Sequence, residues 1–450
     1  MSDAAFDALQ LLRREAAWLG DESLGVCVVG SWALAIACRN AGADGPNPVD
    51  LDLAWALDHD AGTQLLQRHG VFVPTTTGNV DRGTLAMKLA GRRIEITTFR
   101  AGDADAPLAE RIAADLAERD MTIGAIAVEL ASGRMHDPHS GLEHYRARRI
   151  EPVGDPAQRV REHGIRWLRY FRKAHELGFA LAASIRSLRR ELDPALLLDL
   201  PPEAIALELR AILGKCASPG RCLLDLFEAG VLATISPELA AQFDGRPAGP
   251  QRWHPEVSQA LHVVLALEWA RDTAADLDER ERLAVMFAVL CHDLGKNDTP
   301  PAEWPHHRGH EDAGIPHIDR LVKRWPGFVD QQAATLARHV AALHLEIRDF
   351  DQLRPGTLAE LYDRWFRASD YPVEAFAIAV AADVAGRLGH AQDGAGVRDQ
   401  VSRDIGLLRR ACGSVDARSL KQRFGDDLDG FRRALHEARA RAIADARRPG

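Results

Sequence analysis

The sequence predicts an α+β protein, in which a mixed α/β unit at the N-terminus is followed by an all-helical remainder. In the first third of the chain, short apolar runs typical of strands alternate with helical stretches. After Pro156 the pattern changes, because apolar residues such as Ile165, Leu168 and Phe171 recur at helical spacing. A histidine-rich helical region then follows the turn-rich segment 243–250. These three observations place a sheet early in the chain and helices after it.

Three domains are expected, because 450 residues exceed what one hydrophobic core usually organises. The strand-like runs of the first domain are residues 25–29, 50–57 and 92–99. The Gly/Pro-rich stretch 243–250 predicts a linker before the third domain. The expected domains are residues 1–150 (mixed α/β), residues 151–245 (helical) and residues 246–450 (all-α, histidine-rich, with C-terminal helices).

Composition excludes several classes of protein. No stretch approaches the roughly 20 apolar residues that a membrane span needs. The N-terminus has no basic cluster before an apolar run, which argues against a secretory signal, so we expect a cytoplasmic protein without a membrane partner. The six cysteines form no CxxC pair, which favours buried thiols over disulfides or a zinc knuckle.

Charge is distributed unevenly along the chain. The net charge of −9 is unfavourable for binding nucleic acid, because contacts to phosphates need cations. Residues 143–175 nevertheless hold nine Arg or Lys against four acids. Four of these, Arg159, Arg166, Arg169 and Lys173, are spaced by seven, three and four residues, which predicts one basic helical face. Such a face is either simply solvated or binds phosphates.

A first candidate site combines a glycine turn with acidic residues on strands. Gly30-Ser31 follows an apolar strand and precedes an Ala-rich helix, so its backbone can approach a phosphate at a helix N-terminus. Asp50 and Asp52 alternate with leucines, which puts both carboxylates on one face of a strand. Glu95 alternates with isoleucines and projects in the same way if the strands are neighbours. Carboxylate pairs of this kind bind Mg²⁺.

The order of these segments resembles a known family. Gly-Ser, a helix, Asp50-Leu-Asp52, IEITTFR, ERDMTIGAIA and MHDPHSGLEHYRARRI follow one another as in the head domain of class II CCA-adding enzymes and bacterial poly(A) polymerases, of the polymerase β nucleotidyltransferase superfamily. The resemblance implies that Asp50, Asp52 and Glu95 are catalytic, with both aspartates as Mg²⁺ ligands. It also implies the following nucleotide-binding residues: Gly30 and Ser31 on the triphosphate side, Arg119 and Asp120, and the base-reading element Glu162, His163, Arg166 and Arg169.

The chain departs from the family pattern at four positions. Leu34 and Ala35 stand where the family has a cation and an acid after the glycine turn, which weakens the expectation of phosphate affinity. Gly124 replaces a usual Asn. His163 replaces the template Asp, and a neutral imidazole offers one acceptor nitrogen to a base amine. The choice of base is therefore expected to be relaxed or lost.

A second candidate site lies in the histidine-rich region. Nine of the 18 histidines fall between His254 and His344. His292 and Asp293 end an apolar helix in CHDLGK, His262 lies one helix upstream, and Asp383 lies far downstream. Histidine nitrogen and carboxylate oxygen together suit a divalent transition metal or Mg²⁺, which lowers the pKa of a water that attacks phosphorus.

These residues resemble the HD phosphohydrolase domain found in tRNA nucleotidyltransferases with a hydrolase tail. The resemblance implies 2′,3′-cyclic phosphodiesterase, 2′-nucleotidase and phosphatase activity. It makes His262, His292, Asp293 and Asp383 the metal ligands, and Lys296 and His310 phosphate contacts. The roles of His306, His307 and His344, and the identity of the metal, stay open.

Three functions follow from the two sites. The first is a nucleotidyltransferase that adds CMP and AMP from CTP and ATP to the 3′ end of tRNA, with an HD domain that trims damaged or phosphorylated ends. The second is a phosphohydrolase whose degenerate head only binds RNA, and the altered residues Leu34 and Ala35 motivate it. The third is an enzyme that adds A alone, because the template is altered at His163. The sequence leaves the oligomeric state open.

Overall fold

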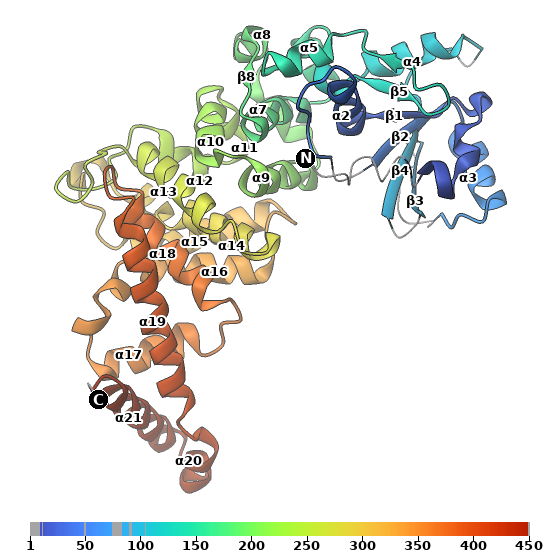
Figure 1. Ribbon diagram of the computed structural model, residues 1–450. Helices are drawn as coiled ribbons and strands as arrows, with labels where there is room; N and C mark the ends of the chain where they lie inside the picture. Colours follow the sequence, from blue (N-terminus) through green and yellow to red (C-terminus); the bar gives the residue numbers. More distant parts are fainter. Residues whose placement is uncertain are drawn as a thin grey trace. The chain divides into compact units, whose positions relative to one another are not determined.

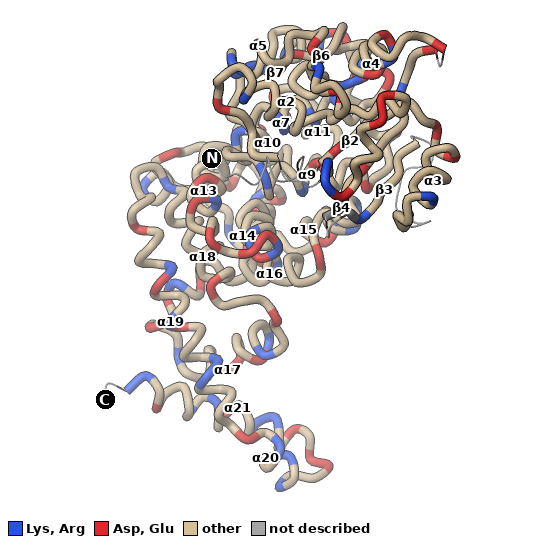
Figure 2. The backbone as a smooth tube through the Cα atoms, turned by 45° about the vertical axis from the view of Figure 1, so that its right-hand side comes forward, with Lys and Arg blue, Asp and Glu red and all other residues tan. Residues whose placement is uncertain are grey.

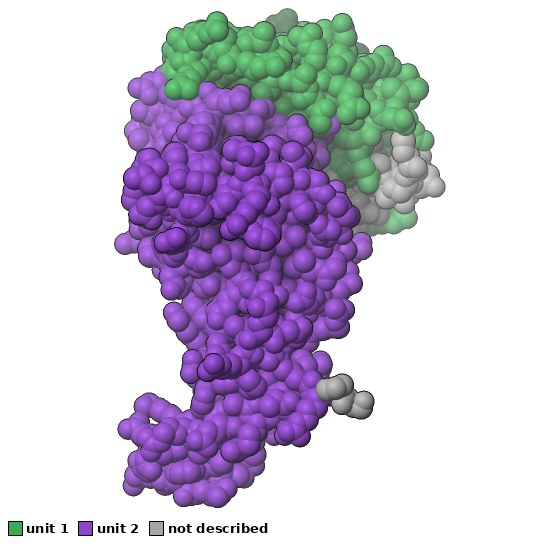
Figure 3. Space-filling view, turned by 90° about the vertical axis from the view of Figure 1, so that its left-hand side faces the viewer, with its two compact units in different colours: residues 1–174, 178–192 green, residues 175–177, 193–450 purple. Residues whose placement is uncertain are grey.

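The computed structural model describes residues 10, 12–48, 51–73, 83–89, 92–103 and 105–448. The chain divides into two compact units, residues 1–174 with 178–192 and residues 175–177 with 193–450 (Figure 3). The predicted α+β fold class is confirmed, with the sheet in the first unit. The segment 243–250 lies inside the second unit, and the division into three domains remains a prediction.

The first unit contains a six-stranded sheet in the order β3-β4-β2-β1-β5-β6, in which β2 and β4 are parallel and the other neighbours are antiparallel (Figure 1). The predicted strands at 25–29, 50–57 and 92–99 are β1, β2 and β4. The strands are β1 (Cys27–Val29), β2 (Leu51–Trp55), β3 (Thr84–Leu89), β4 (Arg92–Thr98), β5 (Ala127–Glu129), β6 (Met135–His136), and the parallel pair β7 (Arg149–Ile150) and β8 (Ala180–Leu181).

Helices cover both faces of this sheet. One core joins Leu53, Trp55 and Ile96 of the strands to Trp32 and Leu66 of two helices, and a second core joins the other face to α4. Leucine and isoleucine of β2 and β4 fill the first core, as their alternation with acids predicts. The helices of this unit are α2 (Gly30–Asn40), α3 (His59–Arg68), α4 (Leu108–Ala117), α5 (Gly141–Arg146), α6 (Pro156–Glu162), α7 (Ile165–Leu177, whose last three residues belong to the second unit) and α8 (Ala183–Arg186).

The described part of the second unit is helical. Its helices are α9 (Pro202–Lys215), α10 (Pro219–Glu228), α11 (Val231–Ile235), α12 (Pro237–Ala240), α13 (Gln259–Thr273), α14 (Glu279–Cys291), α15 (His310–Arg324), α16 (Gln331–Leu343), α17 (Pro355–Leu361), α18 (Val373–Ala385), α19 (Asp393–Gly413), α20 (Ala417–Phe424) and α21 (Leu428–Ala446). Among the described residues, no helix has the length and apolar character required to cross a membrane.

α18 is the central helix of this unit, because nearly all of its residues are buried and it packs against α13, α14 and α19. Its alanine-rich sequence lets these helices approach closely. The C-terminal helices α19 and α21 carry both acidic and basic residues along their length (Figure 2). The buried histidines therefore lie around α18 in the centre of the unit and not at its C-terminal end.

Candidate active sites

Two acidic side chains of the first unit meet on neighbouring strands. β2 and β4 pair in parallel, and the register places Asp52 opposite Glu95. Leu53 and Ile96 are buried beside them, whereas Asp52 and Glu95 are only partly buried. Because side chains alternate along a strand, the two carboxylates lie on one face of the sheet. Asp50 lies outside the described residues, so its geometry with Asp52 stays a prediction.

The glycine turn lies beside these carboxylates. Gly30 opens α2 directly after β1, with φ of +66°, a conformation that favours glycine. A Cβ built on Gly30 would lie 3.5 Å from Oδ2 of Asp52. Ser31 is exposed in the first turn of α2. The backbone N–H groups of this turn favour an anion next to the acidic strands.

The structure gives physical reasons for two departures from the family pattern. Leu34 is 4% exposed, so an apolar residue suits this position and a cation there would be buried. Ala35 is partly buried. A Cβ built on Gly124 meets nothing within 4 Å, so the space that a longer side chain would fill is open.

The predicted nucleotide contacts Arg119 and Asp120 are held by ion pairs. Arg119 Nη2 donates to Oδ2 of the buried Asp115 at 2.8 Å. Asp120 Oδ2 accepts from Arg169 Nη1 at 3.1 Å, and its Oδ1 accepts from the backbone N–H of Met121 at 3.1 Å. The structure therefore brings Asp120 and Arg169 together and orients Arg119 within the same unit.

The base-reading element lies where α6 ends and α7 begins. Arg166 is buried and donates through Nη1 to Glu162 Oε2 at 2.7 Å and through Nη2 to the carbonyl of Glu118 at 2.9 Å. His163 is exposed at the junction, and its backbone carbonyl accepts from the N–H of Arg166 at 3.0 Å. The Arg166 side chain is thus fixed by Glu162 and Glu118, and its backbone N–H is bonded to the carbonyl of His163.

The prediction of one basic helical face is wrong. The chain leaves the helical conformation at His163, so Arg159 lies on α6 while Arg166, Arg169 and Lys173 lie on α7. Arg159 Nη1 pairs with Glu118 at 3.2 Å, and Arg166 is 6% exposed. These two cations connect parts of the head instead of forming a solvated stripe.

In the second unit, α13, α14 and α18 bring the four predicted metal ligands together. His262 comes from α13 and Asp383 from α18. His292 ends α14, and Asp293 follows in a non-helical conformation, so both consecutive side chains face the centre. Two further histidines join them, His310 at the start of α15 and His344 at the end of α16. All six side chains are buried.

The polar atoms of these residues converge. Nε2 of His262 lies 3.3 Å from Nε2 of His292 and 3.4 Å from Oδ1 of Asp383. Oδ2 of Asp293 lies 3.2 Å from Nε2 of His292 and 3.7 Å from Nε2 of His262. Among the described residues, His262, His292 and Asp293 form one group with metal-ligand spacing. Such a set of nitrogen and oxygen donors suits a divalent transition metal.

The other ring nitrogen of these imidazoles is hydrogen-bonded away from the centre. His292 Nδ1 donates to the carbonyl of Val289 at 2.7 Å. His262 Nδ1 lies 3.0 Å from Oε1 of Glu256, which is fully buried and also lies 2.8 Å from His254 Nδ1. With the proton on Nδ1, the Nε2 lone pair points into the centre. Glu256 therefore orients a predicted ligand, and sequence reasoning missed it although it lies in WHPEVSQALH.

The two buried carboxylates of the centre favour positive charge beside them. Burial would raise the pKa of Asp293 and Asp383, but interactions with His292 and Lys296 at Asp293, and with Arg348 at Asp383, hold both pKa values well below their usual range. Burial would lower the pKa of His262, but hydrogen bonds to Asp383 and other acids raise it to about 9. The acidic groups around His262 thus favour positive charge at the centre at neutral pH.

The carboxylates of Asp293 and Asp383 also accept hydrogen bonds from cationic side chains. Asp383 Oδ2 accepts from Arg348 at 2.6 Å and from Arg387 at 3.4 Å. Asp293 Oδ2 accepts from Lys296 Nζ at 2.6 Å. Sequence reasoning did not find Arg348 or Arg387, because each meets Asp383 only through the packing of the helices.

That Lys296 contacts a phosphate stays a prediction, and the structure shows its partners within the protein. Its buried ammonium donates to Asp293, to Gln259 Oε1 at 3.2 Å and to the carbonyl of Ala248 at 2.6 Å, which accounts for its three protons. His310 Nε2 lies 3.2 Å from Asp293 Oδ1, so His310 belongs to the same centre, and its contact with a phosphate stays a prediction.

The histidines whose roles the sequence left open fall in different places. His344 lies in the centre, with Nε2 3.9 Å from Asp293 Oδ1. His307 is buried, and its Nε2 donates to the carbonyl of Pro247 at 2.9 Å. His306 is exposed. Only His344 of the three is therefore placed to act as a ligand.

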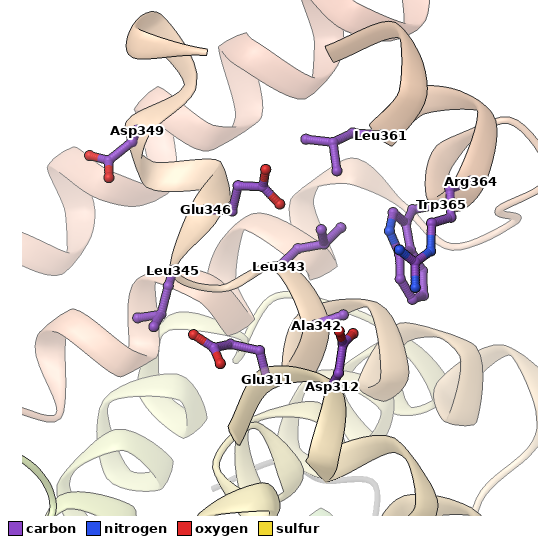
Figure 4. A pocket seen from close by; sticks show the side chains of 10 residues that line it. All are labelled: Glu311, Asp312, Ala342, Leu343, Leu345, Glu346, Asp349, Leu361, Arg364 and Trp365. Atoms are coloured by element: carbon purple, nitrogen blue, oxygen red, sulfur yellow. The ribbon is translucent and has the colours of Figure 1, made fainter. Parts of the chain in front are cut away.

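A cavity of about 390 Å³ is lined by residues of α15, α16 and α17 and of the segments next to them (Figure 4). Glu311 lines it and lies 3.7 Å from Nδ1 of His310, and Leu343 and Leu345 line it on either side of His344 in the chain. The lining residues are Glu311, Asp312, Ala342, Leu343, Leu345, Glu346, Asp349, Leu361, Arg364 and Trp365. Four of these are acids and one is basic, so the cavity favours cations.

Comparisons with known proteins bear on both units. Residues 43–151 match the model of the poly(A) polymerase head domain family. A multifunctional CCA protein of Xanthomonas euvesicatoria pv. vesicatoria (strain 85-10) is 35% identical over 359 residues, which cover 78% of this chain and 83% of the relative. The multifunctional CCA protein of Xanthomonas campestris pv. campestris (strain B100) is also 35% identical, over 78% of this chain and 82% of the relative.

Solved structures show the same fold. The Bacillus stearothermophilus CCA-adding enzyme in complex with CTP is similar over 99% of this chain and 94% of its own, with a TM-score of 0.66 and 21% identity. A tRNA nucleotidyltransferase complexed with a primer tRNA and an incoming ATP analogue is similar over 86% of this chain and 95% of its own, with a TM-score of 0.55 and 15% identity. These two similarities concern the fold alone.

Proposed function

The chain belongs to the family of the multifunctional CCA proteins, and we propose that it adds CMP and AMP, taken from CTP and ATP, to the 3′ end of tRNA in the cytoplasm. The relatives at 35% identity carry this proposal across most of the chain. Asp52 opposite Glu95, beside the Gly30 turn, is the observation within the structure that supports it most directly.

The head residues have separate tasks in this reaction. We propose that Asp50 and Asp52 hold Mg²⁺ and that Gly30 and Ser31 receive the triphosphate at the N-terminus of α2. Mg²⁺, when bound to such carboxylates, supplies charge neutralisation for a transferred phosphoryl group. Glu95 adds a third carboxylate on the same face, and carboxylate oxygens are the donors that Mg²⁺ prefers, so the residues present fit the ion.

The base is read, in this proposal, at the junction of α6 and α7. Arg166 is fixed by Glu162 and the carbonyl of Glu118, and it holds the exposed His163 in place. Arg119, Asp120 and Arg169 complete the nucleotide side through their ion pairs. A pre-formed network of this kind orients a base at little entropic cost when the nucleotide binds.

We also propose that the second unit is a metal-dependent phosphohydrolase acting on 2′,3′-cyclic phosphate and phosphate ends of RNA. His262, His292, Asp293 and Asp383 would hold a divalent metal, which supplies Lewis acidity at a phosphoester when bound. Their converging acceptor atoms fit such an ion. Glu256 retains the Nδ1 proton of His262 and so keeps Nε2 directed at the centre.

The test is an incorporation assay with tRNA that ends before CCA and each labelled nucleotide. Wild type is expected to add C, C and then A, and Asp52→Ala is expected to abolish addition while His292→Ala leaves it intact. Incorporation of A alone would support a poly(A) polymerase-like enzyme instead. No incorporation, with cyclic-phosphate hydrolysis that His292→Ala removes, would support a degenerate head, for which the buried Leu34 is the motivating observation.

A further inference from the structure

Three large apolar side chains are exposed on two segments of the second unit that meet at Glu256. Trp253 is 57% exposed, Val257 48% and Leu388 52%. Trp253 and Val257 belong to the segment before α13, and Leu388 belongs to the segment after α18. Oε2 of the buried Glu256 accepts from the backbone N–H of Leu388 at 3.1 Å, which holds the two segments side by side. We call these three side chains the Trp253 patch.

The backbone at Val257 is held in a conformation that a branched side chain rarely adopts. Its φ is +61°, and the N–H of Ser258 donates to the carbonyl of Glu256 at 2.6 Å across it, as in a three-residue turn. The N–H of Val257 also donates to the carbonyl of His254 at 3.0 Å, which folds residues 254–257 into a turn directly after the Trp253 position. Glycine would adopt this backbone more easily. Strain of this kind is typical of side chains that contact a ligand.

The patch lies beside the histidine centre. Oε1 of Glu256, next to Val257 in the chain, lies 3.0 Å from Nδ1 of His262. Arg387, next to Leu388 in the chain, donates to Oδ2 of Asp383 at 3.4 Å. The Arg387 side chain is 16% exposed, and its Nε is buried with no hydrogen-bond partner among the described residues. On both segments, one side chain therefore connects the patch to a proposed metal ligand.

The chemistry of the patch suits a base of single-stranded RNA. Trp253 exposes an indole ring, and the guanidinium carbon of the exposed Arg252 lies 5.3 Å from the centre of that ring. Indole rings and guanidinium planes stack on bases, and guanidinium groups also pair with phosphates. The cavity in Figure 4 is a less suitable place for RNA, because its four carboxylates repel phosphates.

We infer that the Trp253 patch binds the terminal base of an RNA 3′ end while the phosphate on that end lies at the histidine centre. This inference deepens the proposed hydrolase and rests on it. Trp253 stacks on the base, Val257 and Leu388 contact it with their apolar side chains, and Arg252 pairs with a neighbouring phosphate. Because every base has a π-face, the patch accepts any terminal base.

The experiment measures hydrolysis of a short RNA that ends in a 2′,3′-cyclic phosphate and of glycerol 1,2-cyclic phosphate, which has the same cyclic ester and no base. With Mn²⁺ present, Trp253→Ala is expected to raise KM for the RNA about tenfold at unchanged kcat, as the loss of one stacked base predicts. Trp253→Phe should stay within about threefold of wild type, because its ring still stacks. Hydrolysis of glycerol 1,2-cyclic phosphate should be unchanged in both variants.

Val257→Gly separates a binding role from a structural one. Glycine relieves the left-handed backbone, so the variant is expected to resist denaturant better than wild type. It is nevertheless expected to raise KM for the RNA about threefold, through the lost apolar contact. Leu388→Ala should raise KM by a similar factor. The matched control Leu207→Ala, at a residue of α9 that is 64% exposed, should leave KM unchanged.

A photochemical cross-link tests the contact without turnover. A short RNA with 4-thiouridine as its last base is irradiated on the full chain without added metal, and the cross-linked peptides are identified by mass spectrometry. We expect a cross-link to the peptide that contains Trp253, and Trp253→Ala should lose it. A wild-type protein without any cross-link to the peptides of the Trp253 patch would contradict the inference.

The remaining outcomes distinguish the inference from the function on which it rests. An unchanged KM for the RNA in Trp253→Ala, or an equal loss with glycerol 1,2-cyclic phosphate, would overturn the inference alone. Self-association of wild type that Trp253→Ala abolishes without a change in KM would also overturn it, because the patch would then join two copies of the chain. No hydrolysis of either substrate by wild type would overturn the proposed hydrolase together with the inference.

Discussion

The polar side chains of the two units differ in how they are paired. In the head, charged residues of the nucleotide site are matched by partners of opposite charge, as Arg169 is by Asp120 and Arg166 by Glu162. In the second unit, imidazole nitrogens and carboxylate oxygens point at one another, and Oδ1 of Asp293 has no donor among the described residues. The charged groups of the head are therefore paired with one another, whereas the donor atoms of the histidine centre converge in a way that suits a cation.

The largest expected effect is a loss of nucleotide addition with no loss of cyclic-phosphate hydrolysis. Asp52→Asn keeps the shape of the side chain and removes a carboxylate charge opposite Glu95, and the loss of several kcal/mol of metal-assisted stabilisation corresponds to roughly a 10³-fold slower CMP addition. Single-turnover incorporation of labelled CTP into tRNA lacking CCA measures it. Hydrolysis of 2′,3′-cyclic phosphate by the same preparation should stay unchanged. Equal loss of both activities would show that the units do not act separately.

The next effect concerns how the histidine centre is assembled. A Cβ on Gly295 would lie 1.8 Å from the carbonyl of His310 and 2.6 Å from the N–H of Gly314, so Gly295→Ala forces α15 away from Asp293. We expect a loss of about 3 kcal/mol in unfolding free energy, at the upper end for overpacking. Chemical denaturation measures it, with Gly396→Ala as control because a Cβ there meets nothing within 4 Å. Equal stability of the two variants would contradict the close packing.

A smaller effect is expected from the carboxylate behind His262. Glu256→Gln preserves size but weakens the acceptor for the His262 and His254 rings. Removal of such an orienting carboxylate typically lowers metal affinity by about 10–100-fold. Titration with Mn²⁺ should show this loss with little change in unfolding free energy. An unchanged affinity would mean that packing alone orients His262.

In the first unit, the sequence predicted the strands but not the partners of the charged residues. Alternation in LDLAW and IEI predicted the strands and the shared face of Asp52 and Glu95, because a period of two is a local property. The hydrogen-bond partners of the arginines were not predictable, since Arg166 donates to the carbonyl of Glu118, which lies 48 residues away in the chain. The interpretation of Arg159 to Lys173 as one basic face was wrong because helical spacing does not reveal the break at His163.

In the second unit, the family pattern predicted four metal ligands but not the residues that surround them. Glu256 and Gly295 lie inside quoted motifs, yet their roles depend on His262 and on α15, which only the fold brings near. The three partners of Lys296 were not predictable, because Ala248, Gln259 and Asp293 come from separate segments. Sequence spacing indicated the chemistry of the centre, and long-range packing determined which atoms face it.

The smallest expected effect comes from a buried histidine outside the centre. Burial, with Arg338 and Arg409 nearby, lowers the pKa of His339 to about 4. A depressed histidine pKa means that the unfolded chain binds the proton first, so stability is full above about pH 6.5 and falls as the pH drops toward 4. Between pH 7 and 5.5 we expect a loss of about 1 kcal/mol that His339→Gln removes. A pH profile of unfolding identical in both proteins would contradict this.

The central claim is that the histidine centre is incomplete without divalent cations, and metal-dependent stability tests it most directly. Unfolding of the full chain should be followed after chelation and after addition of Mn²⁺, in wild type and in His292→Ala. The account predicts that Mn²⁺ at 100 times its dissociation constant for the histidine centre stabilises the wild type by about 2.7 kcal/mol more than it stabilises His292→Ala. Wild-type unfolding that is unaffected by chelation and by Mn²⁺ would contradict it.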